Sequence, residues 1–228
     1  MSELSTSPKG EVSGANKLAV GAMVKLGIIL SIYAVIACVG LAFVYNATVK
    51  VIAQRQQDDL NLALKELFKD ADSFKAITNI KIPEKPGEPV VAIEGDKDNP
   101  NNTGAFAAMK NGKVIGAALR TSRASYAGPI KILVGVGADG KICGVKILEH
   151  KDTPGLGSNA GSKTYYVDRA KGIHFFEQFT GKSVNDPFLP KQDVIAITAA
   201  TITSRAVASS VKAAGEAATA WFASGGLK

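Results

Sequence analysis

The chain has few residues of the types that build metal centres or disulfide frameworks. Its 228 residues include two cysteines, two histidines and one tryptophan. Cys38 lies inside a long apolar segment and Cys143 lies far beyond it, so the two cannot meet in a structural disulfide. His150 and His174 stand without a cysteine pair or a carboxylate cluster at metal-ligand spacing. The sequence therefore predicts no zinc or iron site, and it leaves the redox compartment open.

The motifs of several enzyme classes are also missing. There is no G-x-S-x-G elbow and no G-x-G-x-x-G at a strand-to-helix turn. Aromatic residues do not alternate with basic ones as they do on single-strand nucleic-acid surfaces. We therefore expect no autonomous catalytic centre and no nucleic-acid partner. The net charge of +7 suits anionic head groups, a phosphate-bearing cofactor or an acidic partner, unless it is simply a solvated basic surface.

A long hydrophobic segment lies near the N-terminus. Leu26–Tyr45 is a run of twenty residues without a charge, which as a helix spans roughly 30 Å, the thickness of the hydrocarbon layer. The run is longer than a signal-peptide core and no clear small-x-small cleavage site follows it, so we predict a retained transmembrane anchor over a cleaved signal. Lys17 and Lys25 before the run balance Lys50 and Arg55 after it, so charge does not set the orientation.

We predict three parts along the chain. Residues 1–16 are rich in small polar residues and are predicted to be a disordered tail. Residues 17–46 form the anchor, and residues 47–228 form a folded domain. An amphipathic helix is predicted to lead out of the membrane, with apolar residues at Val51, Ile52, Leu60, Leu64, Leu67 and Phe68. Residues 83–104, with four prolines, are predicted to be a loop.

The centre of the chain has the pattern of an antiparallel sheet. Asn111–Gly112 and Asp139–Gly140 are strong hairpin signals between short runs rich in Val, Ile, Leu and Ala. The predicted strands are Gly104–Met109, Lys113–Leu119, Ile130–Val136 and Ile142–Leu148. A helix is predicted from Thr203 to Phe222, with one stripe formed by Val207, Val211, Ala214, Ala218 and Trp221. The expected fold class is α+β, with an antiparallel sheet and flanking helices behind the anchor.

Two segments have the composition of ligand-binding loops. T-A-A-T-I-T-S, Thr198–Ser204, precedes the C-terminal helix, where free N–H groups bind anions and a hydroxyl can hold or esterify a phosphate. The alternative is that these hydroxyls only cap the helix. H-K-D-T-P-G-L-G, His150–Gly157, contains a proline and two glycines that let main chain approach a planar ligand, or that simply form a turn. A weaker third segment is Y-A-G-P-I, Tyr126–Ile130.

The order of these pieces resembles the FMN-binding subunits of redox-driven ion pumps. The pieces are the N-terminal span, Y-A-G-P-I, the D-G hairpin, T-P-G-L-G, F-F-E-Q-F-T-G-K at Phe175–Lys182, and T-A-A-T-I-T-S. They are most similar to the G subunit of Rnf-type electron-transport complexes, and next to the C subunit of the sodium-pumping NADH:quinone reductase. The resemblance covers most of residues 20–225.

The resemblance implies a covalent flavin. In that family the signature S-G-A-T ends in a threonine that bears FMN through a phosphoester, and the matching residue here is Thr201. Thr198-Ala199 stands where Ser-Gly is usual, Ile195 where Asp is common, and Asp152 where Glu is usual. The cofactor-binding residues expected with Thr201 are Thr198, Ala199, Ala200, Thr203, Thr153, Gly155, Leu156, Gly157 and Tyr126; no catalytic or metal-binding residue is expected.

The function that the resemblance implies is electron carriage. The chain would be a covalent-FMN subunit of an ion-translocating oxidoreductase in the cell's inner (cytoplasmic) membrane. Its C-terminal domain would face outward, a flavin transferase would attach the FMN, and polytopic membrane and redox subunits would be its partners. Two alternatives remain open at this point: a membrane-tethered binding or assembly module without a redox cofactor, and a free-standing extracytoplasmic flavin reductase.

Overall fold

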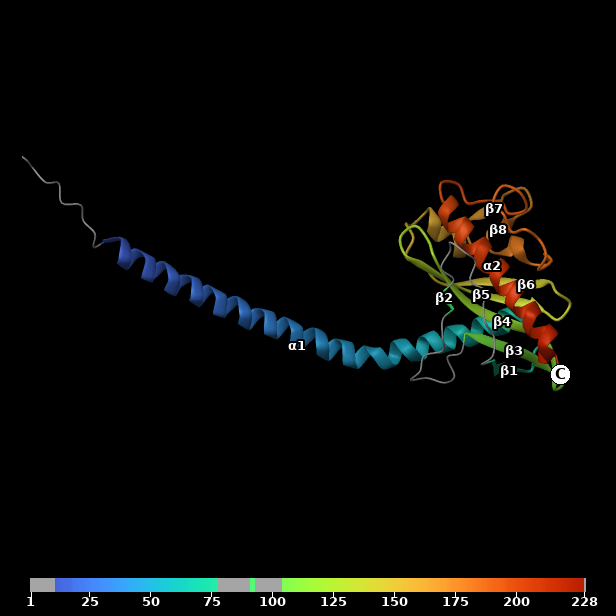
Figure 1. Cartoon of the computed structure of the whole chain (residues 1–228), viewed down its shortest axis with the longest axis horizontal. Coiled ribbons are helices and arrows are strands. Elements are labelled where there is room, and N and C mark those ends of the chain that lie inside the picture. Colours follow the sequence, from blue (N-terminus) through green and yellow to red (C-terminus); the bar gives the residue numbers. More distant parts are fainter. Residues whose placement is uncertain (1–10, 78–90, 93–103, 228) are drawn as a thin grey trace, which may run out of the picture. The chain divides into compact units, whose positions relative to one another are not determined.

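The computed structural model describes residues 11–77, 91–92 and 104–227. The chain divides between Gln56 and Gln57 into two compact units. The N-terminal unit is a single helix, the first part of α1 (Glu11–Leu67) (Figure 1). Helix α1 therefore begins inside the segment predicted to be a tail, and residues 1–10 of that segment lie outside the described residues. The loop predicted at 83–104 also lies outside them, apart from β2 (Val91–Ala92) and Gly104.

Helix α1 has the length and composition of a membrane span. Within the described residues it is the one helix that meets both conditions, with a mean hydropathy of 2.6 in its apolar window. Its large apolar side chains from Met23 to Ile52 are exposed; Leu30, for example, is 72% exposed. Such a helix needs an apolar environment, and a bilayer provides one.

The second unit is built on an antiparallel sheet. Its strands are β1 (Ser73–Ala76), β2, β3 (Ala105–Lys110), β4 (Lys113–Ala124), β5 (Pro129–Gly137) and β6 (Ile142–Glu149). Their order is β1-β3-β4-β5-β6, and β2 also pairs with β4. The predicted hairpins are present: Asn111 and Gly112 have φ angles of 51° and 75°, as a two-residue turn of type I′ requires. The structure thus confirms the predicted α+β fold with an antiparallel sheet.

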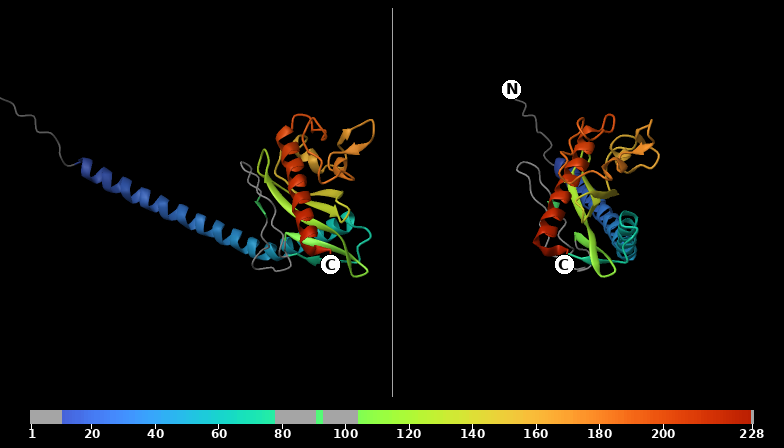
Figure 2. Two further views of the ribbon diagram at one scale, coloured as in Figure 1. Left: turned by 45° about the vertical axis from the view of Figure 1, so that its right-hand side comes forward. Right: turned by 90° about the vertical axis from the view of Figure 1, so that its right-hand side faces the viewer.

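Helices cover both faces of this sheet (Figure 2). Helix α2 (Thr201–Trp221) buries Val207, Val211, Ala214 and Ala218 against one face, where Leu119, Ile132 and Val134 complete a cluster of apolar side chains. The other face packs against the last turns of α1, with Leu60, Ala63, Leu64 and Phe68 over Ala118 and Leu133. A Cβ atom at Gly116 would lie 2.5 Å from the Phe68 ring, so this strand position has to be glycine for the ring to pack there.

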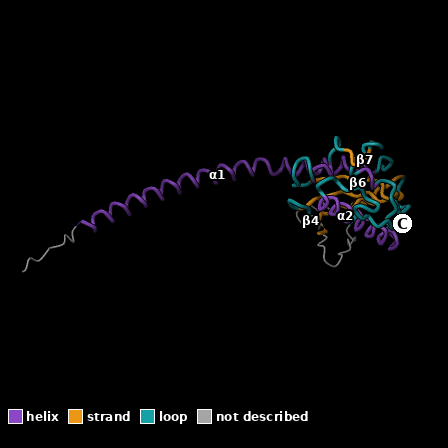
Figure 3. Tube along the Cα trace, turned by 90° about the horizontal axis from the view of Figure 1, so that it is seen from above, coloured by secondary structure: helices purple, strands orange, loops and turns teal. Residues whose placement is uncertain are grey.

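The segment between β6 and α2 is mostly loop (Figure 3). It contains only short elements: η1 (Gly157–Gly161), β7 (Tyr166–Asp168), β8 (Ile173–His174) and η2 (Glu177–Phe179). Phe175, Phe179 and Phe188 are buried and anchor this segment to the core, where the Phe175 and Phe179 rings meet edge to face. The buried aromatic side chains therefore help to hold the loops in place, together with backbone hydrogen bonds such as those between Ile142 and residues 181 and 182.

The predicted domain boundary at residues 46/47 leads to a truncation experiment. We expect residues 47–228 to give a soluble domain that melts cooperatively in circular dichroism, because the side chains of the span contribute nothing to its two clusters. Residues 69–228 should not, because that chain loses four buried side chains, Leu60, Ala63, Leu64 and Phe68. Each buried Leu or Phe contributes about 1.5–3 kcal/mol. A cooperative melt of both chains at one temperature would show that the end of α1 is not part of the core.

Candidate functional site

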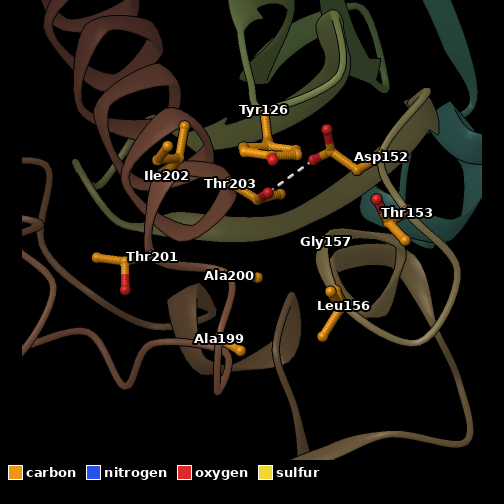
Figure 4. Close-up of a pocket in the computed structure, with 10 residues that line it drawn as sticks. All are labelled: Tyr126, Asp152, Thr153, Leu156, Gly157, Ala199, Ala200, Thr201, Ile202 and Thr203. Carbon is orange, nitrogen blue, oxygen red and sulfur yellow. Dashed lines mark hydrogen bonds between the residues drawn. The ribbon is translucent and has the colours of Figure 1, made fainter.

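A cavity of about 440 Å³ lies where α2 begins. Three segments line it: the turn after β4, the loop after β6, and the chain that enters α2 (Figure 4). Eight of the ten residues predicted from sequence are in its wall, namely Tyr126, Thr153, Leu156, Gly157, Ala199, Ala200, Thr201 and Thr203. Asp152 and Ile202 complete the lining, and neither had been predicted as a site residue. The fold thus brings together residues that are far apart in the sequence.

A second cavity of about 470 Å³ lies along the chain that enters α2. It is lined by residues 191–199, which include Thr198, and by Thr201; Ala199 and Thr201 line both cavities. Gly155 is the one predicted residue that lines neither. Thr201, the first residue of α2, therefore lies at the boundary between the two cavities.

No side chain caps the N-terminus of α2. Ala200 occupies the N-cap position and offers no side-chain hydrogen bond, so the N–H groups of the first turn keep their capacity to bind an anion. The Ser204 hydroxyl accepts the Ile197 N–H at 2.9 Å and donates to the Ala200 carbonyl at 2.9 Å. The expected hydroxyl cap is therefore absent at the N-cap position, and the hydroxyls of Ser204 and Thr203 bond other groups.

Thr201 and Thr203 differ sharply in access. The Thr201 side chain is exposed, and in Figure 4 it points away from Asp152 and Thr203. Thr203 is 1% exposed, and its hydroxyl donates to Asp152 Oδ2 at 2.7 Å. Of the two hydroxyls, only that of Thr201 is placed to meet a large reactant from solvent.

A buried carboxylate holds the inner wall of the first cavity. Asp152 is 5% exposed and accepts three hydrogen bonds, from the Ser125 hydroxyl at 2.6 Å, the Thr203 hydroxyl at 2.7 Å and the Ala127 N–H at 2.9 Å. Burial by itself raises the pKa of the Asp152 carboxyl, but these hydrogen bonds outweigh it and hold the pKa below its ordinary value. The cavity therefore contains a fixed negative charge at neutral pH.

The loop Thr153–Gly157 forms a tight turn beside this carboxylate. The Leu156 N–H bonds the Thr153 carbonyl at 3.1 Å, and the Gly155 N–H bonds the Ser158 hydroxyl at 2.9 Å. Gly155 has a φ of +78°, which favours glycine, and a Cβ there would meet nothing within 4 Å.

Gly157 is a glycine for a different reason. Its φ is not in the positive range, unlike that of Gly155. A Cβ at Gly157 would instead lie 2.6 Å from both Asp152 Oδ2 and Thr203 Oγ1. The lack of a side chain at Gly157 is what lets the loop, Asp152 and α2 meet.

Apolar side chains surround the opening of the first cavity. Tyr126 is 73% exposed, and Leu156 and Ile202 are also exposed although all three line the cavity. Large apolar side chains gathered in this way at the surface of a water-exposed domain mark a binding site. Together with the N–H groups of α2, they suit a ligand with a flat apolar part and an anionic end.

Asp193 has a structural role in the wall of the second cavity. Its carboxylate accepts the N–H groups of Phe188 and Leu189, at 3.1 and 2.7 Å, and pairs with Lys182. Ile195, at the position where the family pattern commonly has Asp, is about half exposed at this cavity. Asp193 therefore does not replace an acidic group at position 195, because its oxygens hold the loop before it.

Ala199 carries backbone strain. Its φ is +59°, a conformation that costs a residue with a Cβ roughly 1–2 kcal/mol relative to glycine, and it stands where the family pattern has glycine.

We therefore expect Ala199→Gly to stabilise the domain by about 1 kcal/mol, the relieved strain less the added freedom of the unfolded chain. Thermal unfolding of the parent and variant checks this. Ala196→Gly is the control, since φ at Ala196 is not positive and the change should destabilise. A lower melting temperature for Ala199→Gly would contradict the assignment of strain.

Comparison with known proteins agrees with this geometry. Residues 125–216 match the profile of the FMN-binding domain, and residues 17–67 match that of the RnfG N-terminal region. The G subunit of the Na(+)-translocating ferredoxin:NAD(+) oxidoreductase complex of Acetobacterium woodii is 31% identical over 196 residues, covering 82% of this chain and 87% of that one. Its counterpart in the proton-translocating ferredoxin:NAD(+) oxidoreductase complex of Clostridium ljungdahlii is 32% identical over 195 residues, with 83% and 88% covered.

A third relative and one solved structure extend the comparison. The G subunit of the ion-translocating oxidoreductase complex of Shewanella baltica is 32% identical over 202 residues, with 83% of this chain and 86% of that one covered. The crystal structure of Shewanella oneidensis NqrC is 18% identical, covers 65% of this chain and 80% of that one, and has a TM-score of 0.42, too low to add to the assignment. On the sequence relatives, the chain belongs to the family of G subunits of ion-translocating oxidoreductase complexes and contains that family's FMN-binding domain.

Proposed function

We propose that the chain carries FMN bound covalently through a phosphoester to Thr201 Oγ1 and passes electrons between redox subunits of its complex. The observation that carries this proposal is the position of Thr201. Its exposed hydroxyl lies at the open N-terminus of α2 and borders two cavities. Membership in the family makes the chain one subunit of a redox-driven translocase and not an autonomous enzyme.

The residues at this site suit FMN. The first cavity, at about 440 Å³, falls within the range of about 300–1,000 Å³ typical of cofactor sites. Tyr126, Leu156 and Ile202 offer apolar contact to a flat ring, and the first turn of α2 offers N–H groups to a phosphate. Gly157 has no side chain, which lets its loop pack against Asp152 and Thr203 in the wall of this cavity.

The attachment is a transfer of a phosphoryl group to a hydroxyl. The Thr201 oxygen would form a bond to the flavin phosphorus, the hydroxyl proton would pass to a base of the transferase, and the bond from phosphorus to a leaving group would break. A flavin dinucleotide supplies such a leaving group as a nucleoside monophosphate. The exposure of Thr201 supports this role, because a separate enzyme has to reach the hydroxyl.

When bound, FMN supplies the electron-accepting and electron-donating chemistry. The chain's residues then have three tasks. Thr201 keeps the flavin from diffusing away, the walls of the cavity orient it and exclude water, and Asp152 fixes the charge beside it. No side chain of the site has to exchange a proton with a substrate for these tasks.

We further propose that α1 anchors the chain in the cell's inner membrane, with the flavin domain on the outer side. Tethering holds the domain at a high effective concentration near its redox partners, the polytopic subunits of the complex. Electrons would then reach the domain through those subunits. One relative belongs to a complex named as Na⁺-translocating and another to a complex named as proton-translocating, at nearly equal identity to this chain, so similarity to them does not indicate which ion is moved.

Mass spectrometry of one peptide tests the proposal. Trypsin releases residues 192–205, which contain Thr198, Thr201, Thr203 and Ser204. We expect this peptide to carry the mass of FMN less one water, and fragmentation should place it on Thr201. An unmodified peptide from protein made with its native transferase would favour the tethered binding module, and a flavinylated chain that never purifies with polytopic subunits would favour the free-standing reductase.

A further inference from the structure

The network around Asp152 is built to hold a charge that the flavin site does not need for attachment. The carboxylate receives hydrogen bonds from two different segments: Ser125 and Ala127 follow β4, and Thr203 lies in the first turn of α2. The Ser125 and Thr203 oxygens also lie 3.2 Å apart, so the two hydroxyls and the carboxylate form one cluster. Its position in the wall of the first cavity places this cluster beside the proposed cofactor.

In this cluster the hydroxyls are the hydrogen-bond donors and the carboxylate is the acceptor. Both hydroxyl protons are directed at Asp152, so the Ser125 and Thr203 side chains bond the carboxylate first and are not free donors to a ligand. Removing a carboxylate with three donors leaves those donors unpaired, which is unfavourable for each buried group. A buried charge with good hydrogen bonds also acts over several ångströms, because little water screens it.

We propose that Asp152 is a positioning residue of the flavin site. Its hydrogen bonds join the turn after β4 to the start of α2, a connection that we call the clasp, and its negative charge lowers the flavin's reduction potential. The second half of this inference rests on the proposed function, since it requires FMN in the first cavity. Reduction adds negative charge to the flavin, and a fixed carboxylate nearby opposes it. The first half concerns the chain alone and does not depend on the cofactor.

Three variants separate the two roles. Asp152→Asn keeps a side chain of the same size with one acceptor oxygen and removes the charge. Asp152→Glu keeps the charge. Asp59→Asn removes an exposed carboxylate that lines neither cavity and serves as the control for net charge.

The charge is tested by redox titration of the flavin absorbance in the full-length flavinylated chains. We expect Asp152→Asn to favour reduction about tenfold, which is about 30 mV toward positive potential for a two-electron couple. Asp152→Glu should stay close to the parent, and Asp59→Asn should not differ from it. A potential of Asp152→Asn equal to that of Asp59→Asn would overturn the electrostatic role while leaving the attachment at Thr201 intact.

The clasp is tested without any flavin, in chains that also carry Thr201→Ala. Hydrogen exchange should become faster in peptides covering Ser125–Gly128 and the first turn of α2 when Asp152 is changed to Ala, and much less so for Asn, which retains an acceptor. If Asp152→Ala does not fold, Ser125→Ala removes one donor and should speed exchange in the same peptides. Unchanged exchange in the Ala variants would overturn the clasp, and absence of flavin from the parent would instead count against the proposed function.

Discussion

Thr201→Ala should abolish covalent flavin and leave the domain folded. The substitution removes the one exposed hydroxyl at the start of α2 that borders both cavities. Because the side chain is at the surface, we expect the free energy of unfolding to change by no more than about 0.5 kcal/mol. Flavin fluorescence of the denatured chain in a gel measures attachment, and circular dichroism measures the fold.

Two further threonine variants make this result specific. Thr201→Ser retains a hydroxyl and should retain at least part of the flavin. Thr219→Ala removes a hydroxyl near the other end of α2 that bonds only the Gly215 carbonyl, and it should keep all of the flavin. The buried Thr203 hydroxyl cannot take over, because its bond to Asp152 keeps it from the surface. Fluorescence of the denatured Thr201→Ala chain would place the attachment at another residue.

Gly157→Ala is the second change with a large expected effect. The new methyl group would lie 2.6 Å from Asp152 Oδ2 and Thr203 Oγ1, so the loop, the carboxylate and α2 must move apart. Overpacking of this kind costs about 1–3 kcal/mol. We expect a lower melting temperature together with a shifted flavin spectrum, since all three groups line the cavity.

Two other glycines separate crowding from backbone strain. Gly155 and Gly172 both have positive φ angles, and a Cβ at either would meet nothing within 4 Å. Gly155→Ala and Gly172→Ala should therefore each cost about 1–2 kcal/mol of conformational strain without filling the cavity. Their flavin spectra should match that of the parent. If Gly157→Ala has the same spectrum and stability as the Gly172→Ala control, the loop does not pack against the site as the structure describes.

Much of the sheet could be predicted because its signals are local. The N-G and D-G turns and the runs of β-branched residues predict both ends of β3, β5 and β6 to within one residue. Strand β4 is the exception, since it continues from the predicted end at Leu119 to Ala124. Arg120 and Arg123 interrupt the apolar pattern there, yet they pair in register with Leu133 and Ile130 of β5. Backbone pairing with a neighbouring strand overrides the side-chain pattern.

Long-range contacts were the part that sequence could not supply. Asp152 is separated by 27 residues from Ser125 and by 51 from Thr203, and no local pattern indicates that these three polar groups meet. The predicted site residues came from a family motif. Such a motif identifies residues, but it does not predict how they are arranged around a cavity. The short strands β1, β7 and β8 were missed because so few of their side chains are buried, which leaves too little periodicity to recognise.

Helix α2 is rich in buried alanine, with Ala206, Ala208, Ala213, Ala214, Ala217 and Ala218 all buried. Side chains this small bring the helix backbone close to the strands and leave no rotamers that could absorb an added methyl group. Enlarging any of these alanines would therefore lift or tilt the helix as a rigid rod. Thr201 is at the N-terminal end of the helix. If it bears the flavin as we propose, substitutions several turns away should change the distance over which an electron has to travel.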